Sequence, residues 1–349
     1  MQLLNVKDLY FKINNNNIIK NINFTLNTGE ILTILGPSGS GKSTILKLLA
    51  GFLKPSQGEI KLRNKLLSSE KLVVSTGKRN IGLMFQEEVL FPHLTIYKNI
   101  AFGIENLKLK NKETIIKKYL QKFGLLDVQN DYPEILSGGE KQRVSLARVL
   151  ITKPKILLMD EPFSSLDKNL RTVISDYTIK VLKKKKISVV FVTHDVKEAL
   201  RISNRILILK NGEIEQIDTP ENIYRSPNSI YTASLLTEVN RFEVVPNKLG
   251  FIITPFGKIK CKENKFFNYY DCSKIKHCCL IRPSDLFFSE NGINAKIVEK
   301  HFLGPAWEYS VFIRKDFPIL KLYSASKHYS IEAKVKVNID LNKVLIYRG

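Results

Sequence analysis

Apolar residues recur along this chain in two patterns, as short unbroken runs and as runs at helical spacing. The unbroken runs at residues 31–35, 156–159 and 189–192 have the length of strands that are buried on both faces. Between residues 94 and 136 the spacing becomes helical, with Thr95 placed to cap one helix and Gly124 to end another. This alternation of strands and helices predicts an α/β fold with a largely parallel sheet.

The same pattern sets the expected domain boundaries. An Asn-Gly pair at residues 211–212 lies between two apolar runs and predicts a hairpin that closes the sheet. We therefore expect an α/β domain over residues 1–235, with a helical insert over about residues 88–150. Residues 236–349 consist of short β-type segments broken by Gly, Asn and Pro, which predicts a small β-rich domain. The four asparagines at residues 14–17 are expected to form a loop.

The charge of the chain first suggests a polyanionic partner. Lysine and arginine number 55 against 33 acidic residues, a net charge of +22, and such an excess attracts nucleic acid or anionic lipid. The lysines are spread over the whole length, however, so a biased composition explains them. The run at residues 183–186 precedes an apolar run and is interpreted as a solvated helix end, with a lipid-facing patch as the alternative. We expect no nucleic-acid partner.

Cellular location and cysteine chemistry are bounded by what the sequence lacks. No apolar run approaches the roughly 20 residues of a membrane span, and the first residues do not resemble a secretory signal. We expect a chain that stays in the cytoplasm.

The spacing of the four cysteines fits neither zinc knuckles nor an evident disulfide frame, so reduced, packed side chains are expected, with metal sensing as the alternative. They are Cys261, Cys272, Cys278 and Cys279.

A glycine-rich segment follows the first buried run and carries the strongest chemical signal. Residues 36–43, G-P-S-G-S-G-K-S, fit the pattern G-x-x-x-x-G-K-[ST] and precede a helical stretch, which is the setting of a phosphate-binding loop. Lys42 is expected to reach the β- and γ-phosphates of ATP, and the Ser43 hydroxyl to ligate Mg²⁺. The predicted ATP-binding residues here are Gly36, Pro37, Ser38, Gly39, Ser40, Gly41, Lys42, Ser43 and Thr44.

Two acids end the buried run at residues 156–159. Asp160 is expected to help hold Mg²⁺, and Glu161 to orient and deprotonate the attacking water. The alternative is an ordinary exposed strand end, where acids are common. A phosphate-binding loop in the same chain favours the catalytic interpretation.

A second glycine-rich segment, L-S-G-G-E-K-Q-R at residues 136–143, opens a helix. Ser137 and Glu140 have the spacing of a capping box. Gly138 and Gly139 remove side chains from this helix end, so an anion can approach its N–H groups. Together with the phosphate-binding loop, this segment resembles the signature of the ABC ATPase family, although Lys141 stands where the family often has Gln.

The resemblance to ABC ATPases implies roles for further residues. Tyr10 would stack on adenine, with Phe11 as the alternative. Gln86 would belong to the loop that contacts Mg²⁺ and the attacking water, Asp167 to the segment S-L-D, and His194 would contact the γ-phosphate. The family arrangement also implies a homodimer, in which the signature residues of one copy close over the ATP of the other. Those residues are Ser137, Gly138, Gly139 and Glu140.

Among ABC machines, the sequence favours a transporter. Only 95 positions separate Lys42 from Ser137, too few for the long coiled coil of chromosome ATPases. Ribosome-associated members generally carry two cassettes, and one is present here. The segment from Gln86 to Thr95 resembles the stretch of importer ATPases that receives a membrane permease. Residues 281–286, I-R-P-S-D-L, resemble the OB-like TOBE-type domain of importer ATPases, although Thr237 stands where Gly is usual at its junction.

The importer resemblance completes the expectations. It implies a peripheral ATPase at the cytoplasmic face of the inner membrane that uses ATP and Mg²⁺. Its partners would be permease subunits and, indirectly, an extracytoplasmic solute-binding protein. Ferric iron is the expected substrate, with polyamines, sulfate or another small solute as alternatives.

Overall fold

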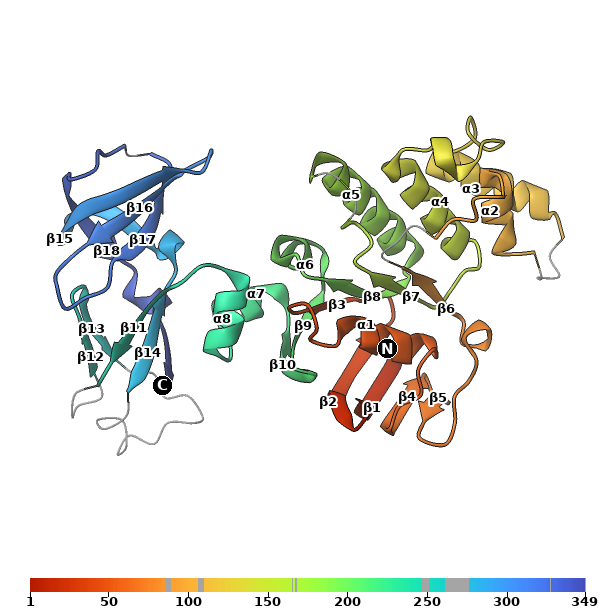
Figure 1. Ribbon diagram of the computed structural model, residues 1–349, viewed down its shortest axis with the longest axis horizontal. Helices are drawn as coiled ribbons and strands as arrows, with labels where there is room; N and C mark the ends of the chain where they lie inside the picture. Colours follow the sequence, from red (N-terminus) through yellow and green to blue (C-terminus); the bar gives the residue numbers. More distant parts are fainter. Residues whose placement is uncertain are drawn as a thin grey trace. The chain divides into compact units, whose positions relative to one another are not determined.

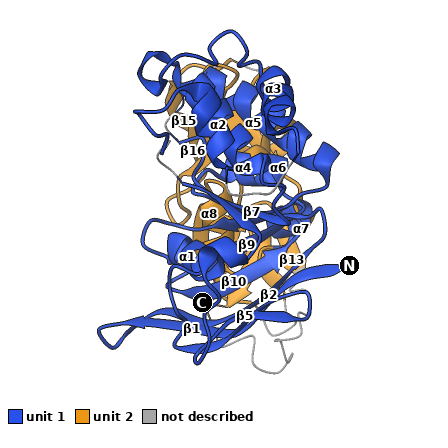
Figure 2. Cartoon of the chain, turned by 90° about the vertical axis from the view of Figure 1, so that its right-hand side faces the viewer, with its two compact units in different colours: residues 1–226 blue, residues 227–349 orange. Residues whose placement is uncertain are grey.

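The computed structural model describes residues 1–85, 89–105, 110–164, 166, 168–246, 251–260, 276–326 and 328–348. The chain forms two compact units, residues 1–226 and 227–349 (Figures 1 and 2). The division falls before helix α8 (Ile230–Leu236). Ala233 of this helix packs against Cys278 and Leu280, and this contact ties α8 to the second unit.

A six-stranded sheet forms the centre of the first unit. Its order is β10-β9-β3-β8-β7-β6, and every neighbouring pair is parallel except β10 with β9. The predicted parallel α/β fold is therefore confirmed. Asn211 and Gly212 form the predicted hairpin turn, with φ of 50° and 80°. The strands are β3 (Ile31–Leu35), β6 (Ile81–Met84), β7 (Ile156–Asp160), β8 (Ser188–Thr193), β9 (Arg205–Lys210) and β10 (Glu213–Asp218).

A second, antiparallel sheet covers the phosphate-loop helix α1 (Lys42–Ala50) on the side away from the other helices (Figure 1). The expected loop at residues 14–17 is only half as long as predicted. Only Asn14 and Asn15 form the turn, because their φ of 46° and 64° suits a two-residue hairpin, and the next two asparagines belong to β2. The order is β2-β1-β4-β5, with β1 (Gln2–Ile13), β2 (Asn16–Asn27), β4 (Gln57–Leu62) and β5 (Lys65–Ser69).

A helical layer packs on the opposite face of the central sheet. Thr95 caps α2 by accepting from Lys98 N, and Gly124 ends α3 in the left-handed region. One apolar cluster joins these helices to β7 and β8. The helices are α2 (Ile96–Phe102), α3 (Lys112–Phe123), α4 (Gly138–Leu150) and α5 (Lys168–Lys185), followed at the sheet ends by α6 (Val196–Ile202) and α7 (Pro220–Arg225). Over the described ranges, no helix is long and apolar enough to cross a bilayer.

The second unit is β-rich, as predicted. Its core is one apolar cluster of buried side chains that extends from Phe242 to Ile339 in the sequence. Cys278 and Cys279 are buried, whereas the other two cysteines lie outside the described residues. No metal-ligating cluster occurs among the side chains that the structure describes. The sheets are β11-β14-β19, β12-β13 and β17-β16-β15-β18. Their strands are β11 (Asn240–Val244), β12 (Phe251–Thr254), β13 (Gly257–Lys260), β14 (His277–Ile281), β15 (Leu286–Phe302), β16 (Trp307–Phe312), β17 (Leu320–Ser324), β18 (Lys334–Ile339) and β19 (Leu345–Arg348).

Candidate functional site

The phosphate-binding loop connects β3 to α1 in a conformation that requires glycine. A Cβ at Gly36 would lie 2.3 Å from Leu209 O, and one at Gly41, whose φ is 105°, would lie 2.7 Å from Ile19 Cδ1. Gly41 begins α1 without a capping side chain, and the first turn carries no acid. The N–H groups of this helix start are therefore available to an anion, which the helix dipole also favours.

Lys42 is enclosed by the loop that precedes it. Its side chain is buried, and Nζ donates to Gly36 O and Pro37 O, at 2.9 Å each. Burial lowers the pKa of Lys42, while the nearby Glu161 and Asp160 raise it. The ammonium group is thus held at the centre of the loop, where the phosphates of a nucleotide would lie.

Asp160 and Ser43 bring two oxygens together across the site. Asp160 ends β7, and its Oδ1 accepts from Ser43 Oγ at 3.1 Å. Burial raises the pKa of Asp160, although the hydrogen bond from Ser43 lowers it. Hydroxyl and carboxylate oxygens are the hard ligands that Mg²⁺ prefers, so this pair fits the predicted metal site.

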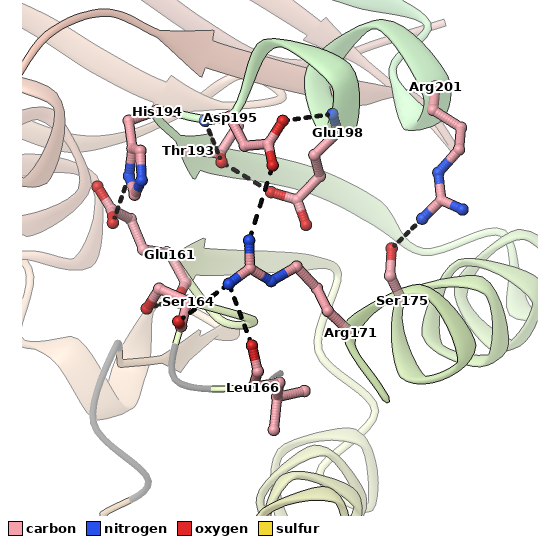
Figure 3. Close-up of polar contacts among 10 residues, drawn as sticks. All are labelled: Glu161, Ser164, Leu166, Arg171, Ser175, Thr193, His194, Asp195, Glu198 and Arg201. Carbon is pink, nitrogen blue, oxygen red and sulfur yellow. Dashed lines mark hydrogen bonds and ion pairs between the residues drawn. The ribbon is translucent and has the colours of Figure 1, made fainter. Parts of the chain in front are cut away.

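Glu161 and His194 meet at the ends of two neighbouring strands. Glu161 follows β7 with φ of 42°, a left-handed conformation that costs energy in a non-glycine residue. Its N–H donates to Val192 O at 3.0 Å, and its Oε2 lies 2.8 Å from His194 Nδ1 (Figure 3). The Glu161 side chain is 17% exposed and that of His194 60% exposed, so the imidazole remains accessible to a ligand.

The signature helix α4 starts with the capping box that its sequence predicts. Glu140 N donates to Ser137 Oγ, and both the N–H and the hydroxyl of Ser137 donate to Glu140 Oε2. These hydrogen bonds lower the pKa of Glu140. A Cβ on the exposed Gly138 would lie 3.3 Å from a methyl of Leu166.

The second glycine of the signature has a different role from the first. Gly139 is buried, and a Cβ there would lie 3.2 Å from a methyl of Leu170 on α5. The sequence predicted that both glycines clear a path for an anion. In the structure, only Gly138 is exposed, while Gly139 permits close packing of α4 against α5.

Sequence reasoning missed a buried glutamine in α4. Gln142 is 1% exposed, and its Nε2 donates to Pro162 O, directly after Glu161. It lies on the same helix face as Gly139 and Leu146, three and four residues away. A polar residue in phase with this packed face was the available signal. Its hydrogen bond joins the signature helix to the segment that carries Glu161.

Phe11, the alternative residue for stacking on adenine, is part of the hydrophobic core. Phe11 is 9% exposed and packs in the cluster beneath the antiparallel sheet, whereas Tyr10 is only partly buried. Phe11 pairs with Ile19, and the Ile19 side chain lies against Gly41 of the phosphate-binding loop. Tyr10 lies on the same strand as Phe11, close to the phosphate-binding loop. Of the two aromatic residues, it is Tyr10 that has accessible surface.

The expected docking segment is held firmly where the structure describes it, from Val89 onward. Asn99 is fully buried, accepts from Phe91 N and donates to the carbonyls of Phe91 and Leu94. Arg148 donates to Val89 O at 2.5 Å. Other predicted residues, Gln86, Glu87, Glu88, Ser165 and Asp167, lie outside the described residues.

Comparison with known proteins agrees with this site. The family model described as ABC transporter matches residues 19–164. An Fe(3+) ions import ATP-binding protein of Haemophilus influenzae is 45% identical over 68% of this chain and 67% of its own length. One from Fusobacterium nucleatum is 33% identical over 99% and 93%. A spermidine/putrescine import ATP-binding protein of Mannheimia succiniciproducens is 39% identical over 88% and 84%.

A solved structure shares the fold. It is cbiO1 of Clostridium perfringens, part of the ABC transporter complex cbiONQ, with 30% identity and a TM-score of 0.58 over 64% of this chain and 90% of that one. The relatives in the preceding paragraph extend this similarity from the cassette to almost the whole chain. The chain belongs to the ABC transporter family, as an ATP-binding subunit whose ATPase activity is coupled to transport.

Proposed function

We propose that this chain hydrolyses ATP to drive an importer, working as a pair of identical copies bound to a membrane permease. The observation that carries the proposal is the meeting of five side chains at one edge of the parallel sheet. Parallel strands present their carboxyl ends on the same edge, and β3, β8 and β7 are consecutive there. The five are Lys42, Ser43, Asp160, Glu161 and His194.

Each of these side chains has a distinct task in hydrolysis. Lys42 would bind the β- and γ-phosphates, and Ser43 and Asp160 would hold Mg²⁺. The ion supplies charge neutralisation at the phosphate oxygens. Glu161 would orient the attacking water and take up its proton, while His194 would contact the γ-phosphate and, through its contact with Glu161, hold that carboxylate in place.

The accessible start of α4 supports the proposed pairing of two copies. Ser137 and Gly138 are exposed, so another copy's nucleotide can reach this helix end. A γ-phosphate held from both sides joins the copies, and its loss on hydrolysis releases them. Gln86 and Asp167 keep their expected roles, at the Mg²⁺ and the attacking water and in the S-L-D segment, as part of this proposal.

The variant Glu161→Gln tests the proposed chemistry. It should bind ATP with Mg²⁺, but its turnover should fall by about 10²-fold or more, because the amide of glutamine cannot take up the proton of the attacking water. Stalled at the ATP stage, it should elute as a dimer in size-exclusion chromatography with ATP and as a monomer without it. Glu134→Gln, at an exposed glutamate, is the control and should hydrolyse ATP normally. Normal turnover in Glu161→Gln would disprove the assignment.

Ferric iron is the substrate we propose, and polyamines are the second candidate. The iron-import relatives support the first, at 45% identity over the cassette and 33% over nearly the whole chain. The spermidine/putrescine relative supports the second, because its 39% identity extends over 88% of the chain. Reconstitution with the cognate permease and binding protein distinguishes them. ATP-dependent uptake of ferric iron without uptake of spermidine is expected, and the reverse result would select the polyamine.

Binding to a membrane permease would put the chain at the cytoplasmic face of the cell membrane, and this location is part of the proposal. The candidate docking surface lies between Val89 and Thr95, where Asn99 and Arg148 already hold the backbone in one shape. Phe91 packs on Phe102, with ring centroids 4.6 Å apart, while Phe102 itself stays half exposed. A rigid, partly apolar surface of this kind suits a short helix of a permease.

A further inference from the structure

One arginine contacts both strand-end segments that carry the hydrolytic residues. Arg171 lies on α5, and its Nη2 donates to Ser164 O at 3.2 Å and to Leu166 O at 3.1 Å. Its Nη1 lies 3.7 Å from Asp195 Oδ2 (Figure 3). The guanidinium group is a planar fork with several donors, so one side chain can hold two segments in a defined geometry.

The first arm of the fork leads to the proposed base. Ser164 accepts from Arg171, and both the N–H and the hydroxyl of Ser164 donate to Glu161 O, at 3.2 and 2.9 Å. Arg171 therefore holds the turn that begins at Glu161. The left-handed backbone of Glu161 is strained, and such a conformation persists only when its surroundings determine it.

The second arm leads to the histidine. Asp195 follows His194 directly, and its Oδ1 caps α6 by accepting from Glu198 N at 3.1 Å. Its own N–H donates to Thr193 Oγ1 at 3.0 Å, which fixes the backbone on both sides of the imidazole. Thr193 Oγ1 in turn donates to Oε2 of the half-buried Glu198 at 2.7 Å. The ion pair with Arg171 thus attaches to a rigid segment.

We propose that Arg171 is a positioning residue for hydrolysis, which sets the separation of Glu161 and His194 by holding the segments after β7 and β8 together. Arg171 reaches the segment of Glu161 at one end and the segment of His194 at the other. The 2.8 Å contact between the Glu161 and His194 side chains completes this ring of contacts. The inference rests on the roles proposed above for Glu161 and His194. The described contacts of the Arg171 guanidinium are with two backbone carbonyl groups and with the carboxylate that caps α6, so its proposed effect is on the geometry of these segments.

The chain supplies a matched control in Arg201. This residue also joins α5 to α6, since it donates to Ser175 Oγ at 3.1 Å and lies 3.1 Å from Asp176 Oδ1. Both of these contacts are on α5, and Figure 3 shows the one with Ser175. Arg201→Met therefore measures the effect of loosening the two helices alone.

The test compares steady-state ATP hydrolysis and ATP affinity in the full-length chain. Arg171→Met should lower kcat about 10- to 100-fold, because a shift of about 1 Å in a reacting group has effects of this size. ATP affinity should change by less than about two-fold, because the phosphate-binding loop is untouched. Arg171→Lys should recover part of kcat, since the ion pair with Asp195 survives without the full fork. Arg201→Met should hydrolyse ATP at close to the normal rate.

A milder variant guards against loss of folding. Asp195→Asn retains a good helix cap but loses the charge that Arg171 contacts. Its effect should disappear in the Arg171→Met background, because the two residues then have no interaction to lose. Additive effects, or equal losses in Arg171→Met and Arg201→Met, would overturn the inference. Normal turnover in Glu161→Gln would instead overturn the proposed function, whatever Arg171 does.

Discussion

At the scale of single residues, a buried arginine holds the far end of the phosphate-loop helix. Arg79 is 1% exposed, and its guanidinium donates to Leu49 O at 2.9 Å, to Val74 O at 2.7 Å and to Ser68 Oγ at 2.6 Å. Burial lowers its pKa. A positive group at the carbonyl end of α1 favours the helix dipole, whose other end faces the nucleotide site.

Arg79→Met should destabilise the first unit. The variant leaves several buried carbonyl groups without their donor, which should cost about 3 kcal/mol of unfolding free energy. For a unit of this size, the thermal midpoint should fall by about 6 to 12 °C. The check is thermal unfolding followed by circular dichroism. Arg225→Met, at an exposed arginine, should leave the midpoint unchanged, and equal midpoints for both variants would contradict the argument.

In the protein without nucleotide, Asp160 should lower the free energy of unfolding at neutral pH. Because burial raises its pKa when the chain is folded, the native state binds more protons than the unfolded state between the two pKa values. The free energy of unfolding therefore falls as pH rises through that window. At neutral pH, Asp160→Asn removes the buried charge and should raise the thermal midpoint, while Mg²⁺-dependent ATP hydrolysis is lost.

The pH dependence separates this cause from general repacking. The gain from Asp160→Asn should shrink as the pH is lowered through the window, because the native aspartate then becomes neutral. Asp127→Asn, at an exposed position, should show no gain. A gain of the same size at every pH would mean that charge burial is not the reason.

At the scale of elements, the sequence predicted what depends on local pattern. Strands β3, β7 and β8, the caps at Thr95 and Ser137 and the end of α3 at Gly124 agree with the structure. Each of these is determined by residues adjacent in the chain. The antiparallel sheet was not predicted, because the pairing of β1 with β4 joins residues far apart in sequence, such as Leu4 and Leu62. The two-residue turn at Asn14 and Asn15 was predicted only as part of a longer loop.

The candidate site shows the same limit. Motifs identified Lys42, Asp160, Glu161 and His194, and the structure brings these residues together, although their chemical roles stay predictions. Arg171 and Gln142 could not be identified, because their importance lies in carbonyl groups that only the fold places nearby.

The start of α4 offers a test at this scale. Ser137→Arg should spare ATP binding but lower turnover by about ten-fold or more, because bulk and positive charge enter a helix end that must receive another copy's phosphate. Ser137→Thr keeps the capping hydroxyl and should hydrolyse ATP nearly normally. ATP binding and hydrolysis are measured on the same preparations. If Ser137→Arg turns over at the normal rate, the shared site is excluded.

At the scale of the whole molecule, each unit has an apolar core of its own. The first unit contains two large clusters, one on each side of the central sheet, and the second has a cluster of β-strand residues. The expected boundary at residue 235 differs from the division after residue 226, since α8 packs on β14. A helix of seven residues at a junction gives no sequence signal of the side to which it belongs.

A fragment of residues 1–226 should fold and bind ATP. Every described residue of the nucleotide site belongs to this unit, and its core is complete without the rest of the chain. Binding is measured with a fluorescent ATP analogue in the presence of Mg²⁺, and affinity should lie within about three-fold of the intact chain. Failure of a folded fragment to bind would show that the second unit contributes to the site.

The packing of Leu166 and Leu170 against the signature glycines has a consequence for a working pair. In the proposed pair, the helix start that would cover a neighbour's nucleotide packs against two leucines that follow the proposed base Glu161 in the same chain. If these leucines moved during turnover, the contact of the signature glycines with the neighbour's nucleotide would change as well. The two ATP molecules in such a pair would therefore not be hydrolysed independently. Hydrolysis at one site would affect the other site through the methyl groups of these leucines.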